Sequence, residues 1–356
     1  MRNITITTAT LLALGASSLL VGCGRQDNNG FSEAIPNESL VNMDFPGADA
    51  ASMTASGTTS QRTSEMPSGV TGENAAFDAA THKTIVTDDV ESASCYDGTV
   101  ELVTRANNTV KYVLNGLDTI TDYRYKEIGY NTYQWGPWDD SDSGLTKRLI
   151  VTVAEDGSYS YSFDAAVTGT DDFLSLVMGE LDAGSTRTSG SGNFVVNLDN
   201  REALEQTGTM GGLETFFYEQ DELSNRSIYV TLSDYLFANG QRDNAILDFT
   251  GNADGTGLLD WFRNRDVYDD GTGEALKEDL AYRSRWQSDH SGRCDGKTQG
   301  GDLGTHVVTA HQCWDVSTAQ VYYQSELDGE VRTTEGTEAA CSYADISYAE
   351  AYSATE

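Results

Sequence analysis

Apolar residues at every second position dominate the chain from about residue 122 onward. The segments 149–153, 159–163 and 194–198 place Leu, Val, Tyr or Phe at alternate positions, mostly with Ser, Thr or Asn between them. Alternation with a period of two puts one set of side chains on one face of a β-strand. Asp156-Gly157 and Asp254-Gly255 separate such segments, and both favour tight hairpins because Gly tolerates positive φ. This pattern restricts the chain to antiparallel strands that follow one another.

Short connections join the expected strands, so neighbours in sequence are expected to be neighbours in one sheet. The sequence therefore predicts a mainly β fold. A long antiparallel meander of about a dozen strands forms a strongly curved sheet or half-barrel, packed on an N-terminal amphipathic helix. A closed barrel plugged by the helix and a two-sheet sandwich are the alternatives. The expected strands are 122–129, 131–136, 147–155, 158–168, 172–182, 191–199, 209–219, 226–234, 243–251, 257–265, 279–289, 304–314 and 318–326.

The amphipathic helix is expected before the strands. Residues 98–121 carry apolar side chains at spacings of three and four, for example at Val103 and Ala106, which gives one apolar face. Asn107-Asn108 is a candidate break that would divide this helix in two. A second, short helix is expected at 199–206, inserted in the meander.

The chain is strongly acidic. It has 56 Asp and Glu against 22 Lys and Arg, for a formal net charge of -34. Nucleic-acid partners need a basic surface, so this balance excludes ordinary DNA or RNA binding, and it argues against adhesion to anionic lipid by charge alone. Dense acidity with few Lys is also typical of proteins in high external salt, where screening reduces self-repulsion, and we hypothesise salt adaptation.

Residues 1–22 have the features of an export signal, with Arg2 near the start and then an apolar stretch too short to anchor in a bilayer. The stretch ends in Leu20-Val21-Gly22-Cys23, which resembles the lipobox of bacterial lipoproteins. The resemblance implies cleavage before Cys23, diacylglycerol on its thiol and a further acyl chain, such as palmitate, on the new amino group. Because Gly24 is not Asp, it also implies the outer membrane, on the periplasmic face or at the cell surface.

Composition divides the rest of the chain into two parts. Residues 23–85 are rich in Ser, Thr, Ala and Gly without a sustained apolar period, which is typical of a flexible tether behind the lipid anchor. Residues 90–350 hold the expected helix and strands, and we expect them to form a single β-rich domain. The membrane is then a partner only through the covalent lipid on Cys23.

Four cysteines follow the predicted lipid site: Cys95, Cys294, Cys313 and Cys341. In an exported chain an even number of thiols favours disulfides, and three connectivities are open. We favour Cys313 with Cys341, which would pin the C-terminal segment to the sheet and leave Cys95 for Cys294. The chain has no Cys-x-x-Cys spacing, so a metal site on these thiols is not expected.

A second resemblance covers residues 90–345. Trp135-Gly-Pro-Trp138, the strand start Gly190–Phe194, the Gly-rich segment 291–302 and Cys313-Trp314-Asp315 occur in this order. The arrangement resembles a group of uncharacterised lipoproteins from myxobacteria, and it implies no functional residues. The plan of a helix followed by a curved sheet is also similar, in architecture only, to lipoprotein carriers of the LolA type, and a fold does not by itself give a function.

Motifs of known chemistry are absent from the sequence, which lacks a Gly-x-Ser-x-Gly elbow, His-Glu-x-x-His, Gly-x-Gly-x-x-Gly and a P-loop. We therefore expect no enzyme activity, no cofactor and no dedicated metal site. The run Asp139-Asp-Ser-Asp-Ser-Gly144 offers oxygen ligands, but Ile150 stands where an EF-hand needs Glu, so only weak Ca²⁺ binding is expected there. The histidines are expected to be structural or solvated: His82, His290, His306 and His311.

Aromatic residues cluster at Tyr130, Tyr133, Trp135 and Trp138. Aromatic rings stack on sugars or line apolar cavities, so these four are the candidate ligand-contacting residues. Packing in the core or at its rim is the more common role of such residues in a β-rich domain.

The sequence thus favours a lipid-anchored envelope protein that acts as a non-enzymatic interaction or structural module, with an envelope protein as a candidate partner. A carrier of a hydrophobic, lipid-like ligand between sheet and helix is the first alternative, and it predicts an apolar cavity. A hydrolase of glycans or esters is the second alternative, and it predicts a cleft with convergent carboxylates of unequal pKa.

Overall fold

The computed structural model describes residues 35–48, 95–121, 123–236, 242–267 and 276–349. Within them the chain forms one antiparallel sheet of 15 strands with a few helices. The helices are α1 (Glu38–Val41), α2 (Cys95–Thr121), α3 (Leu198–Glu205) and the short 3-10 turns η4 (Gly301–Leu303) and η5 (Glu338–Ala340). The strands are β1 (Lys126–Gly129), β2 (Thr132–Asp140), β3 (Leu145–Val153), β4 (Tyr159–Val167), β5 (Leu174–Leu181), β6 (Gly190–Asn197), β7 (Leu213–Gln220), β8 (Arg226–Leu236), β9 (Arg242–Gly251), β10 (Gly257–Arg265), β11 (Glu278–Trp286), β12 (Gly292–Gln299), β13 (Val307–Trp314), β14 (Gln320–Leu327) and β15 (Glu330–Gly336).

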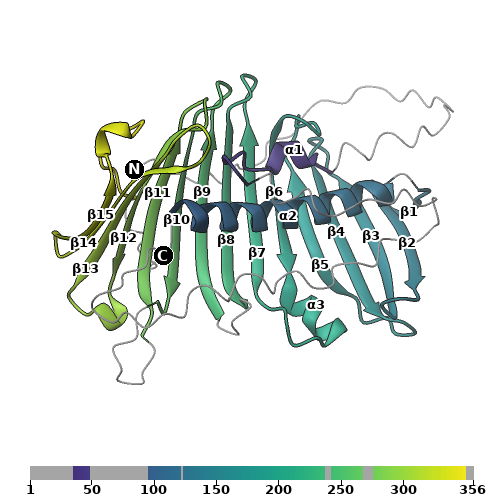
Figure 1. Ribbon diagram of the computed structural model, residues 1–356. Coiled ribbons are helices and arrows are strands. Elements are labelled where there is room, and N and C mark those ends of the chain that lie inside the picture. The colour runs from purple at the N-terminus through teal and green to yellow at the C-terminus, as the bar shows by residue number, and fades with distance from the viewer. Residues whose placement is uncertain (1–34, 49–94, 122, 237–241, 268–275, 350–356) are drawn as a thin grey trace, which may run out of the picture.

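The sheet is a meander, as the alternation predicts. Each strand pairs with the strands before and after it, in the order β1 to β15. α2 lies across the strands on one side of the sheet (Figure 1), which we call the helix face, and the opposite side is the far face. None of the described helices combines the length and apolarity needed to cross a membrane.

The prediction of a strongly curved sheet or half-barrel is wrong. The sheet is open, neither closed into a barrel nor strongly curled, and it does not form a two-sheet sandwich; β1 and β15 are its edges. A helix of 27 residues is about 40 Å long at ~1.5 Å per residue, so α2 covers a strip that crosses many strands. A sheet needs strong curvature only to enclose a compact centre, and a long strip across the strands does not provide one.

The core lies between α2 and the helix face. α2 buries the side that its apolar spacing predicts, with Val103 and Val110 fully enclosed. Alternate residues of the strands meet it, among them Phe194, Phe216 and Phe249, all fully buried, and the first two rings stack at 4.5 Å between centroids. Full burial of a Val, Leu or Phe side chain contributes roughly 1.5–3 kcal/mol, so this layer supplies the main stabilisation of the fold.

Residues 35–48 fall in the expected tether, yet they are packed on the domain. Ile35 and Leu40 are fully buried, and Phe45 is 2% exposed. The Phe45 ring lies 5.1 Å from the Trp286 ring of β11. Only the four residues of α1 form regular secondary structure in this segment. Its apolar residues therefore do not recur at helical or strand spacing, and the sequence pattern could not reveal the packing. The rest of the expected tether lies outside the described residues.

α2 is continuous through Asn107 and Asn108, where the sequence offered a break. The Asn107 side chain accepts a hydrogen bond from the Met43 N–H and donates one to the Met43 carbonyl, both at 2.9 Å. These bonds satisfy the amide outside the helix, so it does not compete with the helical backbone. The short helix expected at 199–206 is present as α3.

Two strands, β12 and β15, were not expected, whereas each expected range overlaps one of the others. β12 begins at Gly292 and reads Gly-Arg-Cys-Asp-Gly-Lys-Thr-Gln, and its first five residues are all buried. β15 is an edge strand, and six of its seven residues are exposed. A strand that is covered on both faces or on neither gives no alternating signal.

Glycines inside the strands face aromatic rings. A Cβ on Gly257 would lie 2.1 Å from the Trp286 ring, and one on Gly292 would lie 2.2 Å from the Trp314 ring. In both cases the glycine is the direct cross-strand partner of the aromatic residue, so the missing side chain makes room for the ring. The same relation holds for Gly179 with Tyr161, Gly192 with Tyr218 and Gly296 with Tyr282.

The Asp-Gly turns expected at 156–157 and 254–255 are present. Each is a five-residue loop in which the first N–H bonds to the fifth carbonyl and the glycine has positive φ, at 86° and 85°. Each aspartate accepts a hydrogen bond from the N–H two residues further on, at 2.9 and 3.0 Å. The same loop recurs where the fourth residue is not Gly, at 221–225, 287–291 and 315–319.

Candidate functional site

The space between α2 and the sheet is filled. The two best-defined hollows in the described part of the chain have volumes of about 10 and 30 Å³. One lies under α2 beside Leu102 and Phe216, and the other lies between residues 35–48 and α2 beside Asn42 and Asn107. A pocket for a drug-sized ligand measures roughly 300–1,000 Å³. These hollows are therefore on the scale of one or two water molecules.

The four candidate aromatics do not form a common site. Trp135 is a core residue, 1% exposed, and its Nε1 donates a hydrogen bond to the Tyr123 carbonyl at 3.0 Å. Tyr133 and Trp138 are partly buried against the core, whereas Tyr130 is 82% exposed beside β1. None of the four lines either hollow between the described residues. Their arrangement is that of core and edge packing.

In the acidic loop after β2, hydrogen-bond donors of the protein itself bind the Asp140 carboxylate. The Asp140 carboxylate accepts hydrogen bonds from Lys147 Nζ at 2.5 Å, the Ser143 hydroxyl at 2.7 Å and the Asp142 N–H at 3.0 Å. Burial alone would raise the pKa of Asp140, but these bonds outweigh it and lower the pKa to about 2. No cluster of the described residues could hold a metal ion, and weak Ca²⁺ binding in this loop stays a prediction.

Both disulfides join an end of the domain to the sheet. Cys95 at the start of α2 is bonded to Cys294 on β12, and Cys313 on β13 is bonded to Cys341 beyond β15. This is the connectivity that the sequence favoured. Disulfides persist in oxidising compartments, so the two bonds indicate an extracellular or periplasmic protein.

Residues 341–349, which we call the C-terminal strap, cross the far face over β11 to β13. The disulfide of Cys341 fixes the start of the strap to β13. Further on, Arg285 of β11 places its guanidinium 4.8 Å from the centroid of the Tyr343 ring and donates to the Asp345 carboxylate at 2.9 Å. The strap therefore meets a cationic part of the sheet with aromatic and acidic side chains.

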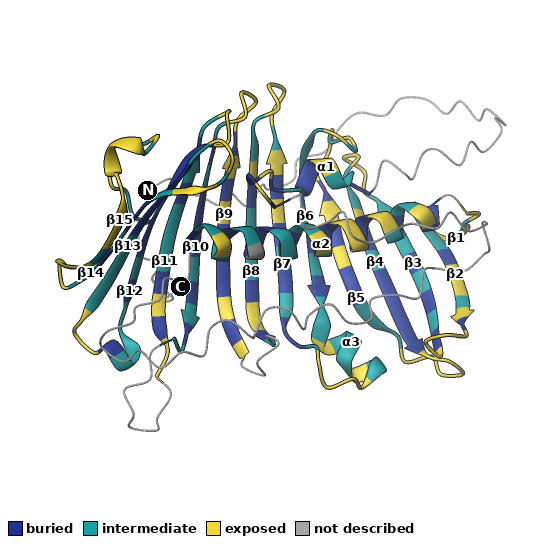
Figure 2. Ribbon diagram, viewed as in Figure 1, coloured by how far each residue is buried: buried dark blue, intermediate teal, exposed yellow. Residues whose placement is uncertain are grey.

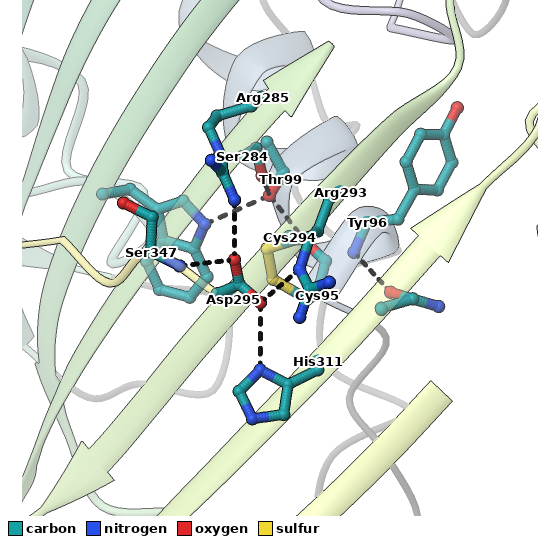
Figure 3. The surroundings of a disulfide bond; sticks show 12 residues. Cys95, Tyr96, Thr99, Ser284, Arg285, Arg293, Cys294, Asp295, His311 and Ser347 are labelled. Carbon is teal, nitrogen blue, oxygen red and sulfur yellow. Dashed lines mark hydrogen bonds and ion pairs between the residues drawn. A yellow bond between two sulfur atoms is a disulfide. The ribbon is translucent and has the colours of Figure 1, made fainter. Parts of the chain in front are cut away.

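A buried carboxylate lies beneath the strap (Figure 3). Asp295 is fully buried, and burial alone would raise its pKa. Hydrogen bonds from its neighbours outweigh that effect and lower the pKa, so the carboxylate is ionised. Its donors are Arg293 Nε at 2.8 Å, His311 Nδ1 at 2.9 Å, the Ser347 N–H at 3.0 Å and Arg285 Nη2 at 3.1 Å.

Asp295 and His311 form a buried acid–histidine pair, a combination that also occurs in catalytic sites. His311 Nε2 lies 3.2 Å from the Tyr348 hydroxyl of the strap, so both ring nitrogens have partners. Such a pair could orient an imidazole for proton transfer. However, His311 is 1% exposed, and a substrate would have no access to it while the strap is in place. The pair therefore holds the strap on the sheet.

Over β5 to β9 the far face is exposed. Burial alternates along β7 and the second half of β5, with buried residues toward α2 and exposed or half-buried ones between them (Figure 2), whereas β12 is covered on both faces. β9 alternates in the same way except at Ile246, which is buried on the far face. Met178 is 42% exposed and Phe217 is 48% exposed. We call this surface the open face, and it is made by Met178, Val195, Thr215, Phe217, Tyr229 and Thr231.

Side chains of the open face form continuous rows across the strands. Met178 is the cross-strand partner of Val195, which is in turn the partner of Thr215. In the next row Phe217 is the partner of Tyr229, and their ring centroids are 6.4 Å apart. Large apolar side chains gathered on a surface mark interaction sites more often than isolated ones do.

Three acids flank the open face: Glu180 on β5, Glu219 on β7 and Asp248 on β9, and all three are exposed. Among the described residues none of them takes part in an ion pair. Burial and the nearby Asp260 raise the pKa of Asp248, although Arg283 opposes the shift. This part of the far face therefore carries acids that form no ion pair with described residues, with Arg283 as the cation near Asp248.

Sequence reasoning missed both the open face and the Asp295 cluster. Phe216-Phe217-Tyr218 was the available signal for the first, because consecutive aromatics put rings on both faces of β7. The Asp295 cluster combines residues of three strands and the strap. These residues are far apart in the sequence, so no local sequence motif could predict the cluster.

Comparison with known proteins finds no match, since no family model, no curated protein and no solved structure matches the chain. The function must therefore be argued from the chain's own surfaces and interior. The candidate lipid site Cys23 lies outside the described residues.

Proposed function

We propose that this chain is an exported, lipid-anchored envelope protein that serves as a non-enzymatic interaction or structural module. The observation that carries the proposal is the contrast between the two sides of the sheet. The helix face is filled, with hollows of only about 10 and 30 Å³, while the far face exposes apolar side chains over β5 to β9. Among the described residues, the surface is therefore the part of the molecule that is available to a partner.

The lipid anchor is proposed on Cys23, in the outer membrane. The two disulfides support export, and the lipobox resemblance supports the anchor. Cys23 and Ile35 are 12 residues apart in the sequence. An extended chain of that length reaches at most ~40 Å at ~3.3–3.6 Å per residue. Because Ile35 is buried against the domain, the anchor would hold the domain close to the bilayer rather than on a long tether.

The carrier alternative receives less support. A carrier must open a cavity between helix and sheet, but the disulfide between Cys95 and Cys294 ties the start of α2 to β12. Thr99, one turn into α2, lies 3.0 Å from the Ser284 hydroxyl of β11 and accepts a hydrogen bond from Trp261 Nε1 at 3.2 Å. The LolA-like plan would therefore be a likeness in architecture without the cavity.

The anchor is tested by metabolic labelling with a fatty acid and by cell fractionation. The wild-type chain should carry the label and sediment with membranes, and Cys23→Ser should lose both properties. Label on the Cys23→Ser variant, or an unlabelled wild-type chain in the soluble fraction, would contradict the proposal.

A further inference from the structure

We propose that the open face docks a protein partner whose contact surface combines apolar side chains with Lys or Arg. This inference rests on the proposed function, because it names the partner of an interaction module. Three observations carry it: the apolar rows, the neighbouring acids that form no ion pair with described residues, and the way in which the chain covers the adjoining part of the same face.

The apolar component comes from side chains that point away from α2. Phe217 and Met178 are 48% and 42% exposed; half-buried Val195 on β6 lies between their strands, and half-buried Tyr229 extends the apolar surface to β8. On the same strands the alternate positions are enclosed, as Phe216 with 0% exposure shows. The two exposed residues therefore offer apolar area to a partner without contributing to the core.

The area of the open face suits a stable complex. β5 to β9 span about 20 Å at ~4.8 Å per strand, and a strand of eight residues is about 27 Å long. The resulting flat area of roughly 500 Å² approaches the ~800 Å² per partner of a standard interface, before the relief of the side chains is added.

The charge component follows from the covered half of the far face. There β11 and β12 present Arg283, Arg285 and Arg293, and the strap contacts all three of them and brings the acid Asp345. Arg283 also forms an ion pair with Asp260 at 2.5 Å. Each of these arginines is therefore matched by an aspartate: Asp345 of the strap pairs with Arg285 at 2.9 Å, and Asp295 accepts hydrogen bonds from Arg285 and Arg293.

On the open face the exposed charges are acidic. Glu180, Glu219 and Asp248 are exposed and form no ion pair with described residues. By the same complementarity, the occupant of the open face brings positive charge together with apolar groups. A second copy of this chain would bring the same three acids and a net charge of -34, so it is disfavoured.

The test measures binding of a peptide that has the proposed chemistry. The probe is a fluorescent ten-residue peptide that alternates Lys with Leu, titrated with the lipidated chain in non-ionic detergent at physiological salt. Two further peptides replace each Lys by Gln or by Glu. The Lys peptide should bind at least tenfold more tightly than either of the others.

Matched variants locate the site. Phe217→Ser combined with Met178→Ser should weaken binding of the Lys peptide at least tenfold, whereas Leu223→Ser, at a residue 73% exposed in the β7–β8 turn, should leave it within twofold. Glu180→Gln with Glu219→Gln and Asp248→Asn should weaken it more than the same charge change at three exposed acids elsewhere, Glu155→Gln with Asp172→Asn and Glu222→Gln.

Three outcomes would overturn the inference. Equal losses for the two sets of charge variants would show attraction to the net charge instead of to this face. Equal binding of the Lys and Gln peptides would remove the cationic requirement. A dimer in sedimentation that Phe217→Ser dissociates would identify a second copy as the occupant. The proposed function would survive each of these results, because the fatty-acid labelling and fractionation of Cys23→Ser test it separately.

Discussion

At the scale of single residues, glycine takes the place of a side chain beside several of the large rings on the helix face. Trp286 and Trp314 are 2% and 1% exposed, and each lies over a glycine of the neighbouring strand. Gly in a strand interior is normally unfavourable, because it loses much backbone freedom and packs nothing. Here the ring fills the space, so composition rich in Gly and aromatics is compatible with a well-packed sheet.

Gly257→Ala tests this pairing. The new Cβ would lie 2.1 Å from the Trp286 ring, so we expect the free energy of unfolding to fall by about 1–3 kcal/mol in urea titrations. Adding Trp286→Leu should recover part of that loss, because the smaller side chain leaves room for the methyl group. The control is Gly116→Ala in α2, which meets no atom within 4 Å and should stabilise by about 0.5–1 kcal/mol. Equal effects of the two Ala substitutions would contradict the account.

Asp140 makes stability depend on acid pH. Its pKa in the folded chain is about 2, below the ~3.9 of an unperturbed Asp, so ionised Asp140 stabilises the folded state. A depressed pKa contributes stability above the unfolded value, and the contribution of about 2 kcal/mol is lost as the pH falls from about 4 to 2. Asp140→Asn should therefore lower the free energy of unfolding at pH 7 and matter little at pH 2. A difference from wild type that is unchanged over this range would refute the assignment.

At the scale of elements, strands could be predicted where one face is covered and the other is not. The first half of β4 and most of β6 alternate in sequence and in burial, and Asp-Gly predicts the hairpins at 156–157 and 254–255. β12 could not be found in the same way, because the strap covers one of its faces and α2 the other. Burial on both faces by polar and glycine residues depends on partners far away in the sequence.

The C-terminal strap should behave as an element that its disulfide holds in place. Cys313→Ser combined with Cys341→Ser opens a loop of sequence separation 28, so we expect the free energy of unfolding to fall by about 3 kcal/mol. Hydrogen exchange at the Ser347 amide, which donates to Asp295 at 3.0 Å, should also become faster. An unchanged urea midpoint with unchanged exchange at Ser347 would show that the strap is held without the disulfide.

At the scale of the whole molecule, the two sides of the sheet differ in what covers them. α2 and residues 35–48 cover the helix face, and the strap covers the far face only over β11 to β13. The mainly β meander and the N-terminal helix could be predicted from the sequence, because alternation and helical spacing each have a local signature. An even number of thiols predicted two disulfides, but it left three connectivities open, of which the observed one was favoured. The openness of the sheet could not, because curvature depends on how a long helix and an irregular segment share the core.

The candidate site belongs to the same scale. The aromatic cluster that the sequence offered is dispersed, since Trp135 is buried and Tyr130 is exposed. Phe217 and Met178 emerge as surface residues only when the register of neighbouring strands places them on the side away from α2.

The central claim is that the open face is the working surface, and oxidative footprinting in cells tests it most directly. In the purified chain, Met178 and Phe217 should be modified readily, as should Leu223 in the β7–β8 turn. In intact cells that produce the protein, the account predicts several-fold slower modification of Met178 and Phe217 and an unchanged rate at Leu223. Equal rates at all three residues in cells and in the purified chain would contradict it.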